Sequence, residues 1–381
     1  MPPATGFVPI VTTGEVVRTS DRTGAGYCPH DPPRGAPDRD DDPREGRVRA
    51  MVLHRPGPAD GAGPLRAEDR PDPVPGPGEL LIAVAACAVC RTDLQIAEGD
   101  LGAHLLPVVP GHQAVGTVVG LGPGVTGWRE GDRAGAYWLA GACGRCRRCR
   151  EGRENLCADA TFTGWDRDGG FAELMTVRAD VAARLPADAD PVAVAPLLCG
   201  GVIGHRALRL SGAGRGSRLG LYGFGASALC VAQVARHLGC EVHVCTRSPR
   251  ERERARDLGA AWTGGYDDAP PVPLDAAITF APSGDVVVAA LRAVDRGGTV
   301  VVNAIHLDRV PSFPYELLWG ERTLRSVANV TRADAAGFLD LATRIPVVTR
   351  SEVHPLADAN HALARLRAGE VDGAAVLVTG G

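Results

Sequence analysis

The sequence has 381 residues, more than one hydrophobic core usually organises, so we expect two domains. Its formal net charge of -4 argues against a nucleic-acid partner, and no apolar run reaches the roughly 18 residues needed to span a bilayer. All 41 basic side chains are Arg, which excludes any mechanism that needs a lysine amine, such as Schiff-base chemistry.

The 11 cysteines are an odd number and are not spaced like the disulfide framework of a secreted protein. The N-terminus also lacks the basic and then apolar pattern of a signal peptide. We therefore expect a reducing, cytoplasmic location in which cysteines serve as metal ligands.

Residues 1–46 are rich in Pro, Asp, Arg and Gly, and the charged run at 38–45 offers nothing that could form a core. Such a composition is typical of disorder, so we expect a disordered extension, or a segment added by an upstream start site. Folded sequence is expected from residue 47.

Short β patterns separated by Gly and Pro follow up to residue 195, which is typical of an antiparallel, partly barrel-like domain. The clearest of these patterns are Met51–Leu53, Leu80–Val84, Val115–Val119 and Arg133–Tyr137.

After Cys199 the pattern changes to alternating strands and helices, which predicts a doubly wound parallel sheet. Helices are expected at Ala226–Leu238 and Pro249–Leu258. The expected strands are Arg218–Tyr222, Glu241–Cys245, Ala276–Phe280 and Thr299–Val302.

The tail carries two helical patterns and ends in a strand at Ala374–Val378. We expect it to return to the first domain. The predicted organisation is a catalytic domain made of 47–195 and 330–381, interrupted by a cofactor-binding domain at 196–329. The active site is expected in the cleft between the two domains.

Four cysteines are clustered with the spacing C-x2-C-x2-C-x7-C, at Cys143, Cys146, Cys149 and Cys157. Two-residue spacings let thiolates converge on one tetrahedral ion, and four ligands leave no open position, so a structural zinc site is expected. A coincidental group of reduced thiols and an iron–sulfur cluster are the alternatives.

Three separate motifs each offer one further metal ligand, at Cys87–Asp93, Pro110–Gly116 and Ala195–Gly201. Taken singly, each has an ordinary interpretation, because a lone Cys is usually a small buried hydrophobe and a His beside Gly is usually a turn residue.

Together with the cysteine lobe, the three motifs resemble those of the medium-chain, zinc-dependent alcohol dehydrogenase family. The resemblance extends over nearly the whole chain after residue 47, in the family's order. Within the family it is nearest to bacterial enzymes of broad primary-alcohol activity and to the cinnamyl-alcohol branch. It implies an α/β fold in which a Rossmann domain is joined to a GroES-like catalytic domain.

The resemblance also implies roles for single residues. A catalytic zinc would be bound by Cys90, His112 and Cys199, with a fourth position left for the alcohol. Thr92 would accept the alcohol's proton, Asp93 would orient the histidine ligand, and Arg91 would contact the cofactor pyrophosphate.

Three positions depart from the common pattern of the family. Gln113 replaces the Glu that many relatives have after the histidine ligand, so carboxylate coordination there is in doubt. Gln95 replaces a His that ends a proton relay in many relatives, and an amide cannot titrate near neutral pH. Ile203 stands where relatives often have Thr near the nicotinamide.

A glycine-rich turn follows the predicted strand at 218–222 and opens a predicted helix, as a dinucleotide fingerprint must. We expect Gly223, Gly225 and Ala228 to form this turn, with Ala in place of the third glycine. Phe280 and Ala304 follow later strands and are expected to line the nicotinamide end.

The second strand of this sheet ends in Thr246-Arg247-Ser248 rather than in an acidic residue. Arg247 offers a charged, planar fork for phosphate oxygens and Thr246 a hydroxyl, so NADP(H) is expected to be moderately favoured, with NAD(H) as the alternative. Trp138 is expected to be a wall of the substrate pocket. His306 is expected either to reach the cofactor or to lie in a surface loop.

The function expected from these features is zinc-dependent hydride transfer between a primary alcohol or its aldehyde and NAD(P). We expect two zinc ions per chain, a small-molecule alcohol or aldehyde as partner, no nucleic-acid or membrane partner, and a homodimer or homotetramer. Polyol or formaldehyde oxidation is the nearest alternative. A zinc-free quinone reductase and a non-catalytic zinc protein are more distant ones, because the three ligand motifs and Thr92 count against them.

Overall fold

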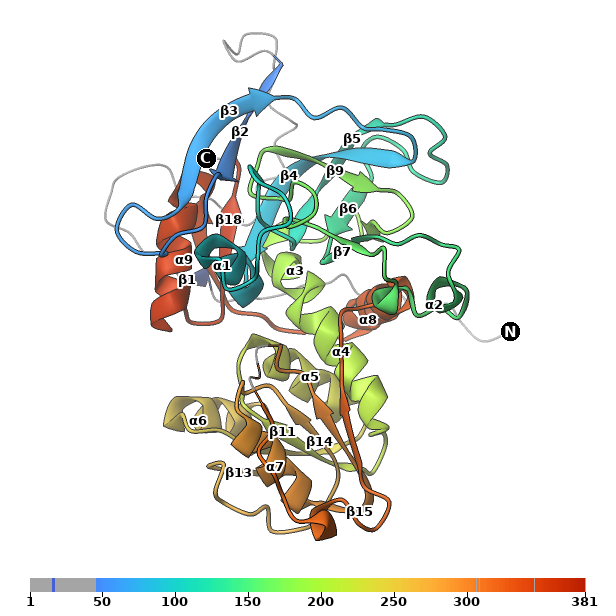
Figure 1. Ribbon diagram of the computed structural model, residues 1–381, viewed down its shortest axis with the longest axis vertical. Coiled ribbons are helices and arrows are strands. Elements are labelled where there is room, and N and C mark those ends of the chain that lie inside the picture. The colour runs from blue at the N-terminus through green and yellow to red at the C-terminus, as the bar shows by residue number, and fades with distance from the viewer. Residues whose placement is uncertain (1–15, 18–45, 306, 308, 346, 381) are drawn as a thin grey trace.

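The computed structural model describes residues 16–17, 46–305, 307, 309–345 and 347–380. The disorder expected for 1–46 and the position of His306 therefore lie outside the described residues, apart from residues 16–17 and Gly46. The described chain forms two lobes, each built around its own main sheet, with α4 (Gly200–Ser211) running between them (Figure 1).

The first lobe contains a mixed, largely antiparallel sheet of eight strands in which β4 (Glu79–Val89) is central. Along the sheet the order is β1 (Val16–Val17), β17 (Ser351–Pro355), β18 (Ala374–Val378), β4, β5 (Ala114–Leu121), β6 (Arg133–Ala136) and β10 (Ala183–Arg184), and β9 (Leu174–Arg178) also pairs with β4. Two small antiparallel pairs complete the lobe, β2 (Arg47–Leu53) with β3 (Leu65–Pro71), and β7 (Leu139–Gly141) with β8 (Thr161–Phe162).

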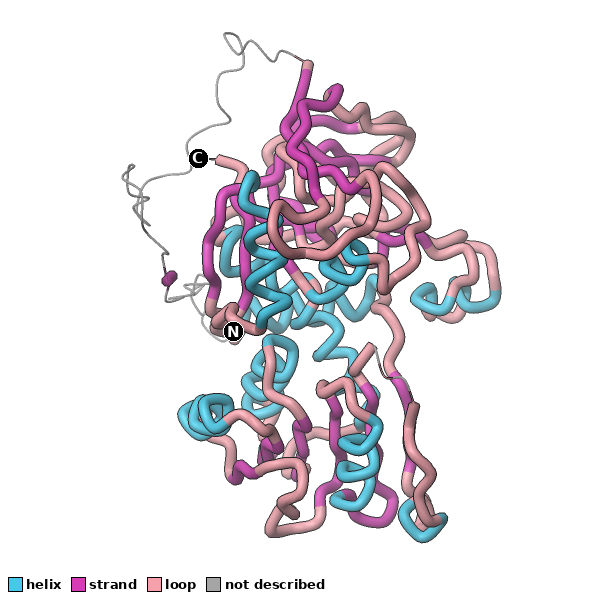
Figure 2. Tube along the Cα trace, turned by 60° about the vertical axis from the view of Figure 1, so that its left-hand side comes forward, coloured by secondary structure: helices cyan, strands magenta, loops and turns pink. Residues whose placement is uncertain are grey.

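Short helices connect and cover these strands (Figure 2). They are α1 (Arg91–Glu98), α2 (Arg147–Arg150), η2 (Glu154–Leu156), α3 (Pro191–Val194), η3 (Ala195–Leu198), α8 (Arg332–Arg344), η5 (Leu356–Asp358) and α9 (Ala359–Ala368). The return of the chain to this lobe after the second sheet is confirmed, because β17 and β18 join the sheet that contains β4.

The second lobe is a parallel six-stranded sheet flanked by helices, which confirms the predicted doubly wound fold. Its strand order is β13 (Trp262–Gly264), β12 (Glu241–Cys245), β11 (Arg218–Tyr222), β14 (Leu274–Thr279), β15 (Val294–Val302) and β16 (Thr323–Ser326). The accompanying helices are α5 (Ala226–His237), α6 (Pro249–Asp257), α7 (Gly284–Ala293) and the short η4 (Tyr315–Leu317). The strand order reverses between β11 and β14, where sheets of this kind bind ligands.

Several elements are longer or more numerous than the sequence pattern predicts. The strand expected at Leu80–Val84 runs on to Val89, because β4 pairs with β5, β9 and β18 and is covered on both faces. The strand expected at Thr299–Val302 begins at Val294. Gly116 in β5 lies against β4 so closely that a Cβ there would be 2.1 Å from the Ala83 carbonyl oxygen.

Among the described residues, no single helix is long and apolar enough to cross a membrane. The pair Pro191–Leu198 and Gly200–Ser211 passes that test only when both parts are joined across a 43° bend. Its apolar side chains pack into the protein core, as the burial of Leu197, Leu198 and Val202 shows.

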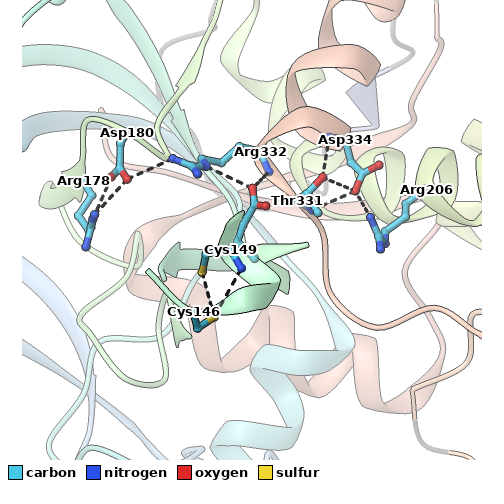
Figure 3. Close-up of polar contacts among 9 residues, drawn as sticks. Cys146, Cys149, Arg178, Asp180, Arg206, Thr331, Arg332 and Asp334 are labelled. Carbon is cyan, nitrogen blue, oxygen red and sulfur yellow. Dashed lines mark hydrogen bonds and ion pairs between the residues drawn. The ribbon is translucent and has the colours of Figure 1, made fainter. Parts of the chain in front are cut away.

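The chain passes between the lobes at two places, at η3–α4 and at 327–331 after β16, and Asp334 in α8 ties these crossings together. The Asp334 side chain has no solvent exposure and accepts hydrogen bonds from the Thr331 backbone N–H and hydroxyl before α8 and from Arg206 in α4 (Figure 3). Arg209 in α4 also pairs with it.

We propose that the two lobes correspond to domains bounded at 47–195 with 330–381, and at 196–329.

Replacing Asp334 by Asn should destabilise the protein by about 3 kcal/mol, because the variant leaves two arginines without their buried counter-charge. Burial opposes the charged form of Asp334, but hydrogen bonds from Thr331 and the charge of Arg206 outweigh it and lower the pKa of the carboxyl. A lowered pKa contributes stability that is complete above the unfolded value of about 3.9 and is lost as pH falls through the folded value.

Chemical denaturation at several pH values measures both effects. The exposed Asp340→Asn on the same helix is the matched control and should change stability by less than about 0.5 kcal/mol. Equal stability of wild type and Asp334→Asn at neutral pH would show that the junction does not depend on this charge.

Candidate active site and metal clusters

Three predicted ligands from distant parts of the chain converge between the lobes. Cys90 caps the N-terminus of α1, His112 precedes β5, and Cys199 lies between η3 and α4. Their ligand atoms all lie within 4.8 Å of one another. The Cys90 Sγ is 3.5 Å from the His112 Nε2 and 4.0 Å from the Cys199 Sγ. This donor set of two thiols and one imidazole could hold a zinc ion with an open position.

Asp93 orients the histidine of this cluster. Its Oδ1 accepts hydrogen bonds from the His112 Nδ1 at 2.9 Å and from the Gly111 backbone N–H at 3.2 Å. Its Oδ2 accepts from the Cys90 backbone N–H at 2.9 Å, which completes a capping box with the Cys90 side chain. Because Nδ1 donates to Asp93, the lone pair of Nε2 faces the two sulfurs, as a metal ligand requires.

The contacts in the cluster favour a thiolate at Cys90. The hydrogen bond from Cys199 holds the pKa of the Cys90 thiol well below its usual range despite burial. The pKa of Cys199 is raised in turn, because it shares that hydrogen bond and is buried beside Cys90. The hydrogen bond between the two sulfurs therefore favours a thiolate, the form that binds metal, at Cys90.

Thr92 and Arg91 lie in the first turn of α1, directly after Cys90. The Thr92 side chain is 7% exposed and its backbone N–H donates to the Cys90 Sγ at 3.3 Å, so the residue borders the cluster. Arg91 is exposed at the first position of the helix. Gln95 is buried one turn further on, and its Oε1 has no hydrogen-bond partner among the described residues.

The Gln113 side chain is hydrogen-bonded to the backbone of β4. Its Nε2 donates to the Ala88 backbone oxygen at 3.2 Å, and the residue is 3% exposed. Ile203 lies on α4, partly buried against the core.

A row of aromatic rings begins at the histidine ligand. The Trp138 ring meets His112 edge-on at 5.1 Å and stacks on Phe162 at 5.0 Å and on Trp165 at 5.9 Å. His104 stacks on Trp165 at 3.6 Å. Of these rings only Trp138 was predicted to line the pocket, although the two rings in Thr161–Trp165 stand out in a chain with 4% aromatic residues. The row makes one side of the cluster apolar and aromatic.

The four predicted cysteines of the second cluster also converge. The Sγ atoms of Cys143 and Cys157 are 3.5 Å apart, those of Cys146 and Cys149 are 3.6 Å apart, and all four lie within 4.8 Å. Backbone N–H groups of Arg145 and Cys146 lower the pKa of the Cys143 thiol to about 7. Figure 3 shows Cys146 and Cys149 side by side at the α2 turn. Four thiols without an open position are a closed site for one ion.

The glycine-rich turn lies at the strand-order reversal of the second sheet. Gly223 has φ 93°, and a Cβ there would be 3.0 Å from the Ala281 backbone N, so only glycine fits this turn. Gly225 caps α5 without a side-chain hydrogen bond, which leaves the first N–H groups of that helix available to an anion. Ala228 is fully buried in α5.

Unpartnered polar atoms and a cavity accompany this turn. Thr279 ends β14 and Asn303 follows β15, next to Phe280 and Ala304, and the Thr279 Oγ1 and Asn303 Oδ1 are buried with no partner in the described part of the chain. A cavity of about 350 Å³ is lined by residues that include Gly225. Because orphaned polar atoms and a glycine cradle meet at one sheet edge, these residues fit a dinucleotide.

At the end of β12 the structure separates the two residues expected to contact a phosphate. Arg247 is exposed, whereas Thr246 is buried and its hydroxyl donates to the Glu251 carboxylate in α6. Ser248 caps α6 by accepting from the Glu251 backbone N–H at 3.3 Å. The Thr246 hydroxyl is therefore already engaged, and an acidic side chain that the sequence pattern does not reveal stands beside the strand end.

A larger cavity, of about 1030 Å³, lies elsewhere, between the β10 region and α8. Its lining includes Trp128, Leu185 and Leu339 and none of the described metal-cluster residues. Size therefore does not mark the chemical site, which is identified by its converging ligands.

Comparison with known proteins gives consistent matches. The family description "Alcohol dehydrogenase GroES-like domain" matches residues 76–187, and "Zinc-binding dehydrogenase" matches 228–344. A probable alcohol dehydrogenase from Mycobacterium tuberculosis is 49% identical, covering 87% of this chain and 97% of the relative.

Two solved structures have the same arrangement of both lobes. A cinnamyl alcohol dehydrogenase from Sorghum bicolor is 27% identical with a TM-score of 0.78, covering 87% of this chain and 97% of that one. A zinc-binding dehydrogenase from Sinorhizobium meliloti bound to NADP is 26% identical with a TM-score of 0.75, covering 87% and 99%.

Replacing Asp93 by Asn should weaken metal binding at the Cys90–His112–Cys199 cluster by about 10- to 100-fold, since the histidine loses the charged acceptor that fixes its tautomer. Competition with a chelating dye measures the affinity. Asp100→Asn, an exposed acid just after α1, is the control and should bind metal like wild type. Wild-type affinity in Asp93→Asn would mean that the ring is oriented by packing alone.

Proposed function

The chain belongs to the medium-chain family of zinc-dependent alcohol dehydrogenases and is an NAD(P)-dependent oxidoreductase, and from that premise we propose that it interconverts primary alcohols and their aldehydes. The observation that carries the proposal is the convergence of Cys90, His112 and Cys199 with an Asp-oriented imidazole. A zinc-free quinone reductase has no use for such a ligand set.

We propose two zinc ions per chain, because the two clusters differ in ligand number. The three-ligand cluster leaves a position for substrate, whereas the four-cysteine cluster is closed and structural. When bound, zinc supplies Lewis acidity that lowers a hydroxyl pKa, as it lowers that of water to about 7, and the nicotinamide supplies the hydride acceptor.

The protein's own residues then hold the substrate and move its proton. We propose that the Thr92 hydroxyl bonds the substrate oxygen and accepts its proton, since the residue follows Cys90 in the same turn. Gln95 cannot continue a proton relay at neutral pH, so the path is short and ends at the cofactor ribose or at water. Arg91 is proposed to contact the pyrophosphate that the start of α5 receives.

The aromatic row favours apolar alcohols. Trp138 stands beside His112, and Phe162 and Trp165 extend the same surface. Polyols need several polar partners to replace their hydration, and these rings offer few. Formaldehyde is too small to cover such an apolar surface. We therefore propose aromatic and medium-chain primary alcohols as substrates, in keeping with the broad primary-alcohol branch of the family.

For the cofactor we propose that NADP(H) is accepted and moderately favoured. Arg247 is exposed beside the end of β12 and offers a fork to a 2′-phosphate. The Glu251 carboxylate, which accepts a hydrogen bond from Thr246, also lies near the end of β12. Its negative charge opposes a 2′-phosphate and limits the preference for NADP(H), so NAD(H) is used as well. Phe280 and Ala304 are proposed to line the nicotinamide end.

We propose a homo-oligomer, most simply a dimer, in a reducing cytoplasm. Ile305, Tyr315 and Trp319 are 76%, 67% and 64% exposed on the segment that joins β15 to the edge strand β16. Exposed apolar side chains beside a sheet edge are typical of an interface. The ten described cysteines are free, which is consistent with a reducing compartment.

Metal analysis of the purified chain should find two zinc ions. Cys199→Ala should lose one ion and all activity while keeping its fold. Cys146→Ala should lose the other and unfold at a much lower temperature, because structural zinc contributes on the order of 10 kcal/mol. One zinc or none in fully active protein would contradict the assignment of the clusters.

Thr92→Ala should lower kcat for benzyl alcohol by about 100-fold or more, because the hydroxyl acts on the reacting oxygen. Cofactor affinity, measured by quenching of tryptophan fluorescence, should stay near the wild-type value. Thr92→Ser retains the hydroxyl and should remain within a few-fold of wild type. If the Ala and Ser variants are equally active, Thr92 is not the proton acceptor.

Arg247→Ala should lower kcat/KM for NADP by roughly tenfold, the loss of one charged hydrogen bond, and leave kcat/KM for NAD nearly unchanged. Arg256→Ala, exposed on the neighbouring helix α6, is the control and should alter neither value. A strong wild-type preference for NAD that the Arg247 variant retains would overturn the cofactor proposal without touching the zinc chemistry.

A further inference from the structure

Asn329 stands out by its backbone in the segment that carries the chain from β16 to α8. It has φ 52°, and among the described residues only Glu321 is another non-glycine residue with positive φ. Asn tolerates this left-handed conformation better than most residues, but Gly does so at no cost. The Asn side chain must therefore make contacts that offset this cost.

The Asn329 side chain joins the pocket wall to the cysteine lobe. The Trp138 Nε1 donates to its Oδ1 at 3.1 Å, and its Nδ2 donates to the Asn155 backbone oxygen at 3.3 Å. An indole N–H can only donate and a carbonyl oxygen can only accept, so both contacts require the same orientation of the amide. The side chain is thus held at both ends.

Asn155, whose backbone oxygen accepts this hydrogen bond, is itself held in place. Asn155 lies in η2, between the third and fourth cysteines of the lobe, and its Nδ2 donates to the Ala328 backbone oxygen at 2.8 Å. Next to it, Glu154 accepts hydrogen bonds from the Arg332 backbone N–H at 2.8 Å and from the Arg332 Nε at 3.2 Å.

Arg332 also forms a second ion pair. Its guanidinium also reaches Asp180, which pairs with Arg178 (Figure 3). The segment around Asn329 is therefore held to the cysteine lobe on both sides, and this fixes where its amide presents an acceptor.

The acceptor decides where the Trp138 indole lies. The ring meets His112 on one side and stacks on Phe162 on the other, so a rotation of the indole changes the surface that faces the substrate. The Trp138 side chain is partly buried, and a buried N–H that loses its acceptor is driven towards another position.

We propose that Asn329 is a positioning residue for substrate specificity: it fixes the Trp138 indole beside the histidine ligand and couples that placement to the cysteine lobe. The inference rests on the proposed function, since it takes Trp138 as a wall of the alcohol pocket. It adds to that function a residue that is distant in sequence from every metal ligand. Asn329 acts only through Trp138 and contacts no reacting atom.

The test is the ratio of kcat/KM for benzyl alcohol to that for ethanol, because a purely structural role changes both values together. Asn329→Gly keeps the backbone conformation and removes the acceptor, and it should lower the ratio about tenfold. Trp138→Phe keeps an aromatic ring without the donor and should lower it similarly. Asn329→Asp keeps an acceptor for the indole but loses the donor to the Asn155 backbone oxygen, so its ratio should lie between those of wild type and Asn329→Gly.

The double variant Trp138→Phe with Asn329→Gly separates the coupling from independent effects. Its ratio should equal that of Trp138→Phe alone, because the indole through which Asn329 acts is already gone. The matched control is Glu321→Gly, the same kind of backbone substitution at the other positive-φ residue, and it should leave the ratio unchanged.

An unchanged ratio in Asn329→Gly, or a further fall in the double variant, overturns the inference. If Asn329→Gly does not fold, Trp138→Phe and Asn329→Asp decide: both must lower the ratio, and Asn329→Asp must lower it less than Trp138→Phe does. Wild-type protein without activity on either alcohol would instead refute the proposed function. A ratio that responds to Trp138→Phe but not to Asn329→Gly refutes only the role of Asn329.

Discussion

The carboxylate of Asp93 is buried without any solvent exposure, and a charge in such a place is stable only while its hydrogen bonds are formed. Those bonds come from the Cys90 backbone, the Gly111 backbone and the His112 ring, at 2.9, 3.2 and 2.9 Å. Two of the three ligands are therefore placed by one side chain. The end of β4, the start of α1 and the loop before β5 are therefore held together by the bonds that satisfy this carboxylate.

The neutral side chain at position 113 is consistent with the same constraint. Gln113 donates to the Ala88 backbone oxygen, and its own backbone oxygen accepts from the Ala88 N–H at 3.1 Å. A carboxylate there could not donate the first of these bonds and would add a second buried negative charge near Asp93. The departure from the common family pattern is thus compatible with an intact cluster, because the amide forms hydrogen bonds that hold the loop before β5 to the end of β4.

Features encoded by short spacings could be predicted from the residues alone. The convergence of Cys90, His112 and Cys199 could be predicted only through the resemblance to the family, and contacts between distant segments that carry no family motif could not be predicted. The four cysteines and the glycine turn lie within single loops, and the structure brings each set together as expected. Helix α4 was not predicted, because Gly200-Gly201-Val202 resembles a turn. The glycines are there because the helix packs closely against its neighbours: a Cβ at Gly201 would be 2.3 Å from the Phe338 ring. Likewise, the bond from Thr246 to Glu251 depends on how α6 packs against β12.

The crossing at 327–331 shows why the pocket wall was only partly predictable. Trp138 could be identified as a large ring near the ligands, but its orientation depends on Asn329, which lies 191 positions away along the chain. That residue is held by Asn155 on one side, and α8, which begins just after it, is tied to α4 through Asp334. The junction between the lobes and the proposed wall of the pocket therefore share one short segment. We infer that a change that loosens the junction also releases the indole, so that the shape of the proposed pocket depends on how the two lobes are joined.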